Sequence, residues 1–309
     1  MLISIIANLV SLYSLIALPL INTQVIDVGN FAESGRVNLV KTSLLRDAPY
    51  RLNNYSLGMK VTAPSALIVD KKSGAVLWQK NPEAARPLAS ITKLMTALVF
   101  LEHQPTAETE IIIQPSDNRG GGRVYIFPGE TIKVQDLFNA SLVASLNNGI
   151  MALVRSTGLK EEEFVAAMNQ KARDLGMADT VFIEPTGLSP DNISTASDII
   201  KLMKAAFAQP EIVFATTQAE YSFSVINAAR HYTLKNTDKL LGSYLQIKAG
   251  KTGYLDEAGY CLAAEIIGPQ GQEILVVVLG SATESDRFQD LKALAQWAFD
   301  NYHWTFLPS

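Results

Sequence analysis

Short apolar runs rich in β-branched residues lie at both ends of a region that begins near residue 65. Ser65–Asp70 and Ala75–Gln79 are separated by a polar stretch that ends in Gly74, which predicts a β-hairpin with the glycine in its turn. Three further strand candidates close the region, at residues 244–253, 259–267 and 274–282. The pattern predicts a sheet built from both ends of one domain.

Between these strands, apolar residues recur at the spacing of α-helices. The clearest helix runs from Ser90 to about Glu102, where Ile91, Leu94 and Met95 begin an apolar pattern of helical period. Further helices are expected at residues 131–145, 161–175, 194–208 and 285–302, and residues 118–130 are expected to form a glycine-rich loop and a short strand. The order of elements predicts an α/β fold of the α+β type, in which an antiparallel sheet carries a mainly helical insert.

The first 21 residues carry no charged side chain. This length fits the core of a signal peptide or a short membrane span, and a buried helix is the third alternative. A basic leading stretch and a clean cleavage motif are both missing, so cleavage and retention as an inner-membrane anchor stay open. We expect residues 1–21 to direct export to the periplasm or another extracytoplasmic space, residues 22–60 to form an irregular lead-in or linker, and residues 61–305 to form the functional domain.

The composition mainly excludes classes of partner and of binding site. The formal net charge is −4 and no basic tract stands out, so we expect no nucleic-acid partner. Cys261 is the single cysteine of the chain, which excludes an internal disulfide and a cysteine-rich zinc site. His103, His231 and His303 lie far apart and show no metal-binding spacing. We therefore expect neither a metal ion nor a cofactor.

Ser90 and Lys93, in the sequence S-I-T-K, are the first candidate catalytic residues. Residues three positions apart share one face of a helix, so the lysine amine can reach the serine hydroxyl. The serine lies at the expected helix start, where free N–H groups favour developing negative charge. Burial among apolar neighbours and a nearby positive charge would depress the pKa of the lysine, and a neutral lysine activates a serine without histidine.

Two later segments contain side chains that suit the same chemistry. Ser145 and Asn147 lie at the end of an expected helix, where the hydroxyl can relay a proton and the amide can hold the lysine or a substrate amide. Lys251, Thr252 and Gly253 lie on an expected strand just before a turn. A strand edge can pair with an extended peptide, while the cation and the hydroxyl suit a substrate carboxylate and the glycine leaves room for backbone. Each of these short segments is common in unrelated proteins. Only their occurrence together, in this order, points to a function.

These three elements, in this order, resemble the signature set of penicillin-binding proteins and serine β-lactamases. From about Ser65 to Tyr302 the chain is similar to low-molecular-mass penicillin-binding proteins of the D-alanyl-D-alanine carboxypeptidase/endopeptidase family. The resemblance also covers the segments ASITKLMT, PGETIKVQDL, LVASLNN, FIEPTGLSPDNISTASDI and GKTGYLDEAGYCL. It implies a β-lactamase/transpeptidase-like fold with a five-stranded antiparallel sheet flanked by helices.

The resemblance also implies a role for each motif residue. Ser90 would be the nucleophile that accepts the acyl group, Lys93 its proton acceptor, and Ser145 and Asn147 the second catalytic element. Lys251 and Thr252 would bind the carboxylate side of the substrate, and the backbone N–H groups of Ser90 and Tyr254 would form the oxyanion hole. The implied reaction is acyl transfer from the D-alanyl bond of a peptidoglycan stem peptide, and β-lactams would acylate the same serine.

Differences between these motifs and those of related families narrow the expected activity. Leu146 stands where class A β-lactamases have aspartate, and their E-x-x-L-N element is absent, since the nearest glutamate, Glu184, lies in a different motif. A β-lactamase is therefore the lesser alternative. The chain stops soon after Trp304, whereas many carboxypeptidases of the family carry a further β-rich domain and an amphipathic tail. The E-P-T-G-L and G-Y-x-x-E-A-G-x-C segments are closer to the endopeptidase branch, so both cleavage modes stay open.

Two other classes of function compete with the enzyme. A non-catalytic protein with this fold would only bind muropeptides or β-lactams, but the intact motif residues argue against it. A membrane-associated structural protein, suggested by residues 1–21, leaves the ordered motifs unexplained.

Overall fold

The computed structural model describes residues 48–53, 55–103, 106–122 and 124–305. The segment expected to direct export, residues 1–21, and most of the expected lead-in lie outside the described residues. Within the described part of the chain, no helix combines the length and the hydropathy needed to cross a membrane.

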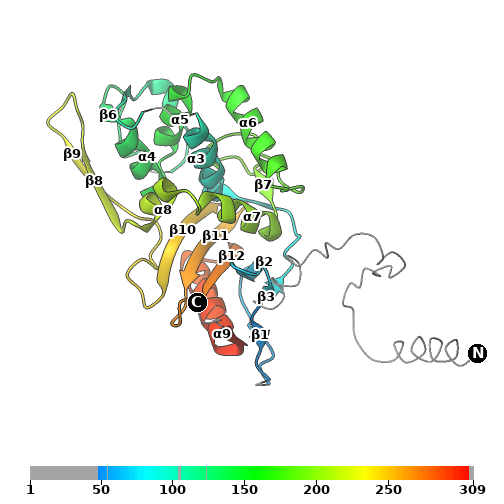
Figure 1. Ribbon diagram of the computed structural model, residues 1–309. Helices are drawn as coiled ribbons and strands as arrows, with labels where there is room; N and C mark the ends of the chain where they lie inside the picture. The colour runs from blue at the N-terminus through cyan, green and yellow to red at the C-terminus, as the bar shows by residue number, and fades with distance from the viewer. Residues whose placement is uncertain (1–47, 54, 104–105, 123, 306–309) are drawn as a thin grey trace, which may run out of the picture. The chain divides into compact units, whose positions relative to one another are not determined.

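A five-stranded antiparallel sheet forms the centre of the domain and confirms the expected architecture (Figure 1). Its strand order is β10-β11-β12-β2-β3. The bounds are Ser65–Asp70 for β2, Val76–Lys80 for β3, Gln246–Leu255 for β10, Gly259–Ile267 for β11 and Glu273–Ser281 for β12. Leu67 of β2 lies opposite Val277 of β12, so the first strand of the sheet pairs with its last. Strand β10 is left at an edge.

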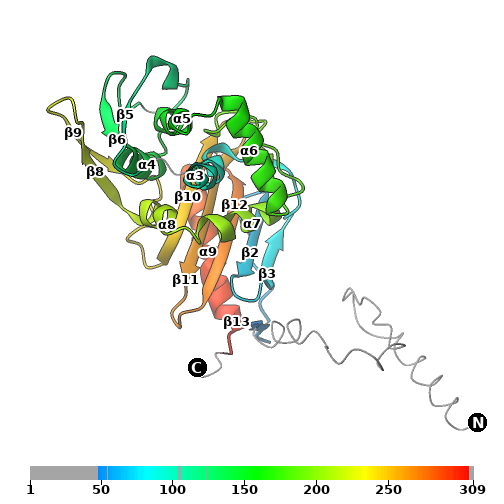
Figure 2. The same ribbon diagram turned by 45° about the horizontal axis from the view of Figure 1, so that its top comes forward.

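Both faces of this sheet are covered, which explains why its three inner strands, β2, β11 and β12, are almost wholly buried. Leu275 and Val277 belong to the apolar core on one face, whereas Ile274 and Val276 belong to a second core on the other. Helices α3–α8 lie on the side of the first face, where α7 and α8 pack directly against the sheet, and α9 covers the second face (Figure 2). They are α3 Thr92–Glu102, α4 Val134–Val143, α5 Asn147–Ser156, α6 Glu161–Asp174, α7 Ala196–Ala206, α8 Pro210–Thr217 and α9 Glu284–Asn301.

Four short antiparallel pairs complete the description. They are β1 Tyr50–Arg51 with β13 Tyr302–His303, β4 Arg86–Pro87 with β7 Ile193–Ser194, β5 Glu110–Ile112 with β6 Thr131–Lys133, and β8 Glu220–Ser224 with β9 His231–Lys235. The helix expected from residue 131 begins only at Val134, because the three preceding residues pair with β5. The short strand expected within residues 118–130 is also wrong, since the described residues there form turns and bends.

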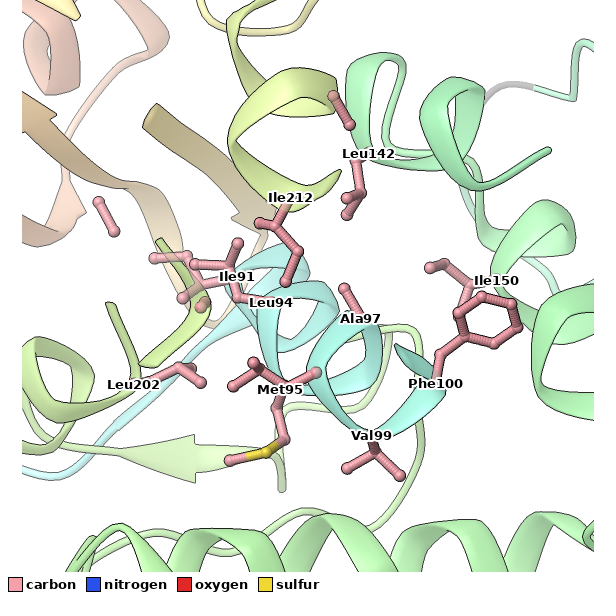
Figure 3. Close-up of a cluster of buried hydrophobic side chains, with 14 of the residues drawn as sticks. Ile91, Leu94, Met95, Ala97, Val99, Phe100, Leu142, Ile150, Leu202 and Ile212 are labelled. Carbon is pink, nitrogen blue, oxygen red and sulfur yellow. The ribbon is translucent and has the colours of Figure 1, made fainter. Parts of the chain in front are cut away.

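Helix α3 is buried on every side and lies at the centre of the helical layer. Figure 3 shows its apolar side chains surrounded by residues of the neighbouring helices, among them Leu142 of α4, Ile150 of α5, Leu202 of α7 and Ile212 of α8. A helix that is apolar all round belongs in a protein core. Consequently Lys93, in the first turn of α3, starts inside the protein rather than at its surface.

The carboxylate of Asp290 on α9 ties the start of the domain to its end. It accepts hydrogen bonds from the backbone N–H of Thr62 at 2.9 Å and of Ala63 at 2.9 Å, and from the hydroxyl groups of Thr62 at 2.8 Å and Ser281 at 2.9 Å. Asp290 is buried, so its removal would leave these donors without acceptor or water.

We predict that Asp290→Ala lowers the free energy of unfolding by about 2–4 kcal/mol, because buried hydrogen bonds to a charged group are lost. Urea unfolding followed by circular dichroism measures this change. The control is Asp300→Ala on the exposed side of the same helix, which should stay within about 0.5 kcal/mol of the parent. Equal effects of both substitutions would contradict the role given to Asp290.

Candidate active site

The α-helix expected from Ser90 begins two residues later, at Thr92, and Ser90 lies in a 3-10 turn over Ala89–Ile91 that leads directly into α3. The residue before it, Ala89, has a left-handed backbone with φ of 48°. A non-glycine residue adopts this conformation at a cost, and such positions are frequent at functional sites. The turn presents the half-buried hydroxyl of Ser90 at the N-terminal end of the buried helix.

The amine of Lys93 is enclosed by three oxygen atoms from three segments. Nζ lies 2.9 Å from Oγ of Ser90, 2.7 Å from Oδ1 of Asn147 and 2.5 Å from the carbonyl oxygen of Thr186. The side chain is fully buried. The first of these contacts confirms that the lysine reaches the serine, as residues three apart on a helical turn should.

Burial lowers the pKa of Lys93 to about 7, while the negative charge of Glu184 acts in the opposite direction. Near neutral pH a large part of the amine is therefore uncharged. A neutral amine has two N–H donors and one lone pair. The acceptors on Asn147 and Thr186 match the two donors, which leaves the lone pair to accept the proton of Ser90.

The second motif lies between two helices, because α4 ends at Val143 and α5 begins at Asn147. Ser145 has a left-handed backbone with φ of 57°, which turns the chain between them. Its Oγ accepts a hydrogen bond from Nζ of Lys251 at 3.0 Å. Ser145 thus contacts the third motif while Asn147 contacts the first, so this segment joins the two lysines.

The third motif lies on β10, the edge strand of the sheet, as the sequence predicts. Lys251 is buried, and burial together with the positive charges of Lys93 and Arg287 lowers its pKa well below the ordinary value. The hydroxyl of Thr252 lies 2.6 Å from that of Thr237. A β-carbon on Gly253 would approach the carbonyl oxygen of Leu88 to 2.9 Å and the backbone nitrogen of Ser90 to 3.1 Å, so glycine permits the strand to pack against the serine turn.

These segments surround a cleft of about 720 Å³. Its lining includes Ser90, Ser145, Asn147, Thr252, Gly253 and Tyr254. The two lysines stand behind this lining, and the ring of Tyr254 stacks on Tyr260 with centroids 4.3 Å apart at the rim. All the expected site residues are thereby brought together. In the described part of the chain, no three His, Cys, Asp or Glu side chains are placed to hold a metal ion.

Glu184 has a structural role that its sequence motif did not reveal. Its carboxylate accepts hydrogen bonds from the backbone N–H groups of Thr186, Gly187 and Leu188 at 2.5–2.9 Å, and from the amide of Asn192 at 2.8 Å. These contacts hold the loop that directs the carbonyl of Thr186 at Lys93. Gly187 packs so closely that a β-carbon there would lie 2.0 Å from the carbonyl oxygen of Ala89.

Arg287 on α9 is the second residue that the motifs did not reveal. It is buried, lines the cleft and donates a hydrogen bond from its guanidinium to the carbonyl oxygen of Gly253 at 3.0 Å. No local pattern identifies it, because it lies more than thirty positions after β10 and approaches the strand from the opposite face of the sheet. It adds a positive charge beside Lys251.

Comparison with known proteins agrees with this geometry. Residues 53–283 match the family Peptidase_S11, described as D-alanyl-D-alanine carboxypeptidase. The chain belongs to this family. It is 35% identical over 250 residues to the D-alanyl-D-alanine endopeptidase of Pseudomonas aeruginosa, with 78% of each chain covered. It is 31% identical over 241 residues to the D-alanyl-D-alanine endopeptidase of Escherichia coli, with 77% of each chain covered.

Solved structures show that the D-alanyl-D-alanine carboxypeptidase family fold is conserved here. The DD-transpeptidase of Streptomyces K15 superposes with a TM-score of 0.75 at 24% identity, covering 79% of this chain and all of that one. Penicillin-binding protein D2 of Listeria monocytogenes, solved in a cefotaxime-bound form, superposes with a TM-score of 0.69 at 27% identity, covering 79% of this chain and all of that one. The expected transpeptidase-like fold is confirmed.

We predict that covalent labelling of this family member by a fluorescent penicillin accelerates as the pH rises through about 7, as the expected role of neutral Lys93 as the base requires. In Lys93→Arg the guanidinium stays protonated, so labelling should slow by about 10²- to 10⁴-fold. Fluorescence gels of samples quenched at set times between pH 5 and 9 give the labelling rates of the parent and of Lys93→Arg. A parent rate that is flat between pH 6 and 8, or a Lys93→Arg variant that labels normally, would refute this role.

We further predict that Glu184→Gln lowers the free energy of unfolding by about 1.5–3 kcal/mol, because the loop N–H groups lose an anionic acceptor. Loss of its negative charge also removes an influence that raises the pKa of Lys93, so the rising limb of the labelling profile should move to lower pH. Exposed Glu162→Gln on α6 is the control. If the rising limb of the Glu184→Gln labelling profile stays at the pH of the parent, Glu184 does not raise the pKa of Lys93.

Proposed function

We propose that this protein is a serine-type D-alanyl-D-alanine carboxypeptidase/endopeptidase that cleaves peptidoglycan stem peptides through an acyl-enzyme on Ser90. The observation that carries the proposal is the position of the Lys93 amine. It is buried, its pKa is lowered to about 7, and it lies 2.9 Å from the serine hydroxyl. Family membership supports the same reaction class.

In the first step, Oγ of Ser90 bonds to the carbonyl carbon of the scissile D-alanyl bond, and its proton passes to Nζ of Lys93. The negative charge that forms on the carbonyl oxygen is stabilised by the backbone N–H groups of Ser90 and Tyr254. As the C–N bond breaks, the leaving amine takes a proton from the hydroxyl of Ser145, and the proton that Lys93 accepted replaces it, so Lys93 becomes neutral again. Lys251 stays protonated and holds Ser145 through their 3.0 Å hydrogen bond. Water then attacks the ester carbonyl carbon while neutral Lys93 takes its proton, and that proton passes to Oγ of Ser90 as the bond between the acyl carbon and Oγ breaks.

The substrate carboxylate would bind where positive charge gathers behind the cleft. Lys251 and Arg287 are both buried beside β10, and Thr252 adds a hydroxyl. The edge position of β10 leaves backbone groups that can pair with an extended stem peptide. Gly253 keeps that edge close to the nucleophile.

β-Lactams would acylate the same serine, and we expect slow release of the acyl group, as in a penicillin-binding protein rather than a β-lactamase. A fast β-lactamase needs a base that activates water against the acyl-enzyme. Glu184 is the nearest candidate in sequence, and its carboxylate is engaged by the backbone of its own loop and by Asn192. A protein that only binds muropeptides would have no use for a lysine poised at the serine.

The location of the substrate supports export. Peptidoglycan lies outside the cytoplasmic membrane, and the uncharged residues 1–21 provide the segment for translocation. We place residues 61–305, the catalytic domain, in the periplasm or an equivalent space, with residues 22–60 as its lead-in.

We predict that the parent protein releases D-alanyl products from purified muropeptides and that Ser90→Ala abolishes the release. The nucleophile is then missing while the fold is kept, because a half-buried hydroxyl is replaced by a methyl group. Chromatography with mass detection measures the products, and thermal unfolding checks the variant. Release by Ser90→Ala equal to that of the parent would overturn the mechanism.

The same digestion separates the two cleavage modes. Monomeric pentapeptides that lose a terminal D-alanine indicate carboxypeptidase activity, whereas cross-linked dimers that fall to monomers indicate endopeptidase activity. The relatives from Pseudomonas aeruginosa and Escherichia coli carry the name endopeptidase. We therefore expect the dimers to be cleaved.

A further inference from the structure

Behind the Lys251–Thr252–Gly253 strand lies a buried carboxylate that none of the motifs includes. Asp238 is 3% exposed and follows Thr237, the residue that contacts the hydroxyl of Thr252. Its Oδ1 accepts a hydrogen bond from the backbone N–H of Leu240 at 2.9 Å. Its Oδ2 is buried and has no hydrogen-bond partner within the described part of the chain.

Oδ2 of Asp238 lies against the strand β10. A β-carbon on Gly250 would lie 2.9 Å from this oxygen, so the carboxylate lies directly against the residue that precedes Lys251. A buried carboxylate oxygen without a partner is costly and needs an explanation. Nε of Arg287, on the same side of the strand, is also buried without a partner among the described residues.

Positive charges would predominate around Lys251 if Asp238 were absent. Lys251 on β10 faces the positive charges of Lys93 on α3 and Arg287 on α9. The carboxylate that pairs with Arg287, Glu284, is nearly half exposed and is shared with Lys239. Asp238 is the buried negative charge that opposes the loss of the proton from Lys251.

The influence is mutual. Burial raises the pKa of Asp238, whereas the N–H of Leu240 and the charges of Arg287 and Lys251 favour its ionised form. The carboxylate and the two cations therefore stabilise one another behind the strand.

We propose that Asp238 is a positioning residue that keeps Lys251 protonated, and that it thereby sets the upper pH limit for binding a substrate carboxylate. The proposal rests on the function proposed above. Asp238 touches neither the substrate nor the nucleophile; it acts through Lys251. Its loss should affect ligands with a carboxylate at alkaline pH first.

The test is the pH dependence of acylation by a fluorescent penicillin, a probe that carries the required carboxylate. Asp238→Asn keeps the shape of the side chain and removes its charge. We expect the falling, alkaline limb to move to lower pH by about one to two units, the size of shift that a nearby opposite charge produces. Asp238→Ser should show the same displacement, so the test survives if one variant does not fold.

Two controls separate charge from structure. Asp238→Glu keeps the negative charge and should retain the parent limb. Exposed Asp300→Asn makes the same change in net charge far from the strand and should leave the profile unchanged. Thermal unfolding of each variant reports any loss of fold.

The outcomes are distinct. A parent protein that is not acylated at any pH would overturn the proposed function. A parent that is acylated, with folded Asp238→Asn and Asp238→Ser variants that keep its alkaline limb, would overturn the role of Asp238 and leave the proposed function intact.

Discussion

The burial of the Lys93 amine is the constraint on which the rest of the site depends. An ammonium group removed from water needs a counter-charge, and none of its three oxygen neighbours belongs to a carboxylate. Release of the proton relieves that cost and leaves an amine whose donors are satisfied by Asn147 and Thr186. The same step would create the base that the proposed mechanism requires beside Ser90. Stability of the core and reactivity of the serine therefore share one cause.

The scaffold keeps this amine enclosed by close backbone packing. Left-handed residues at Ala89 and Ser145 turn the chain toward the cleft, and Gly187 and Gly253 permit two segments to touch the serine turn. The sheet contributes the edge strand β10, and α9 covers the face of this strand that points away from the helices. The charged side chains of Arg287 and Asp238 therefore lie behind the strand that lines the cleft. The resulting site has two buried lysines linked through the Ser145–Asn147 segment.

Much of this architecture could be predicted from local patterns, because strands buried on both faces and a helix apolar all round leave strong signals. The three motifs located the residues that surround the cleft for the same reason, since each motif is contiguous. Two helices are not visible in these patterns. Helix α5 begins within the second motif, and α8 begins at Pro210, a residue type that commonly follows the end of a helix as well as starting one. Arg287 and Asp238 reach the site through tertiary contacts, which no spacing in the sequence encodes.

The most direct test of the account is the protonation state of Lys93 in the resting protein. Labelling the lysine side chains with ¹³C at Cε, with Lys93→Arg as the assignment control, allows the titration of this amine to be followed by NMR. We expect this amine to titrate near pH 7. A Lys93 signal that remains that of an ammonium group up to about pH 10, as for an ordinary lysine, would contradict it.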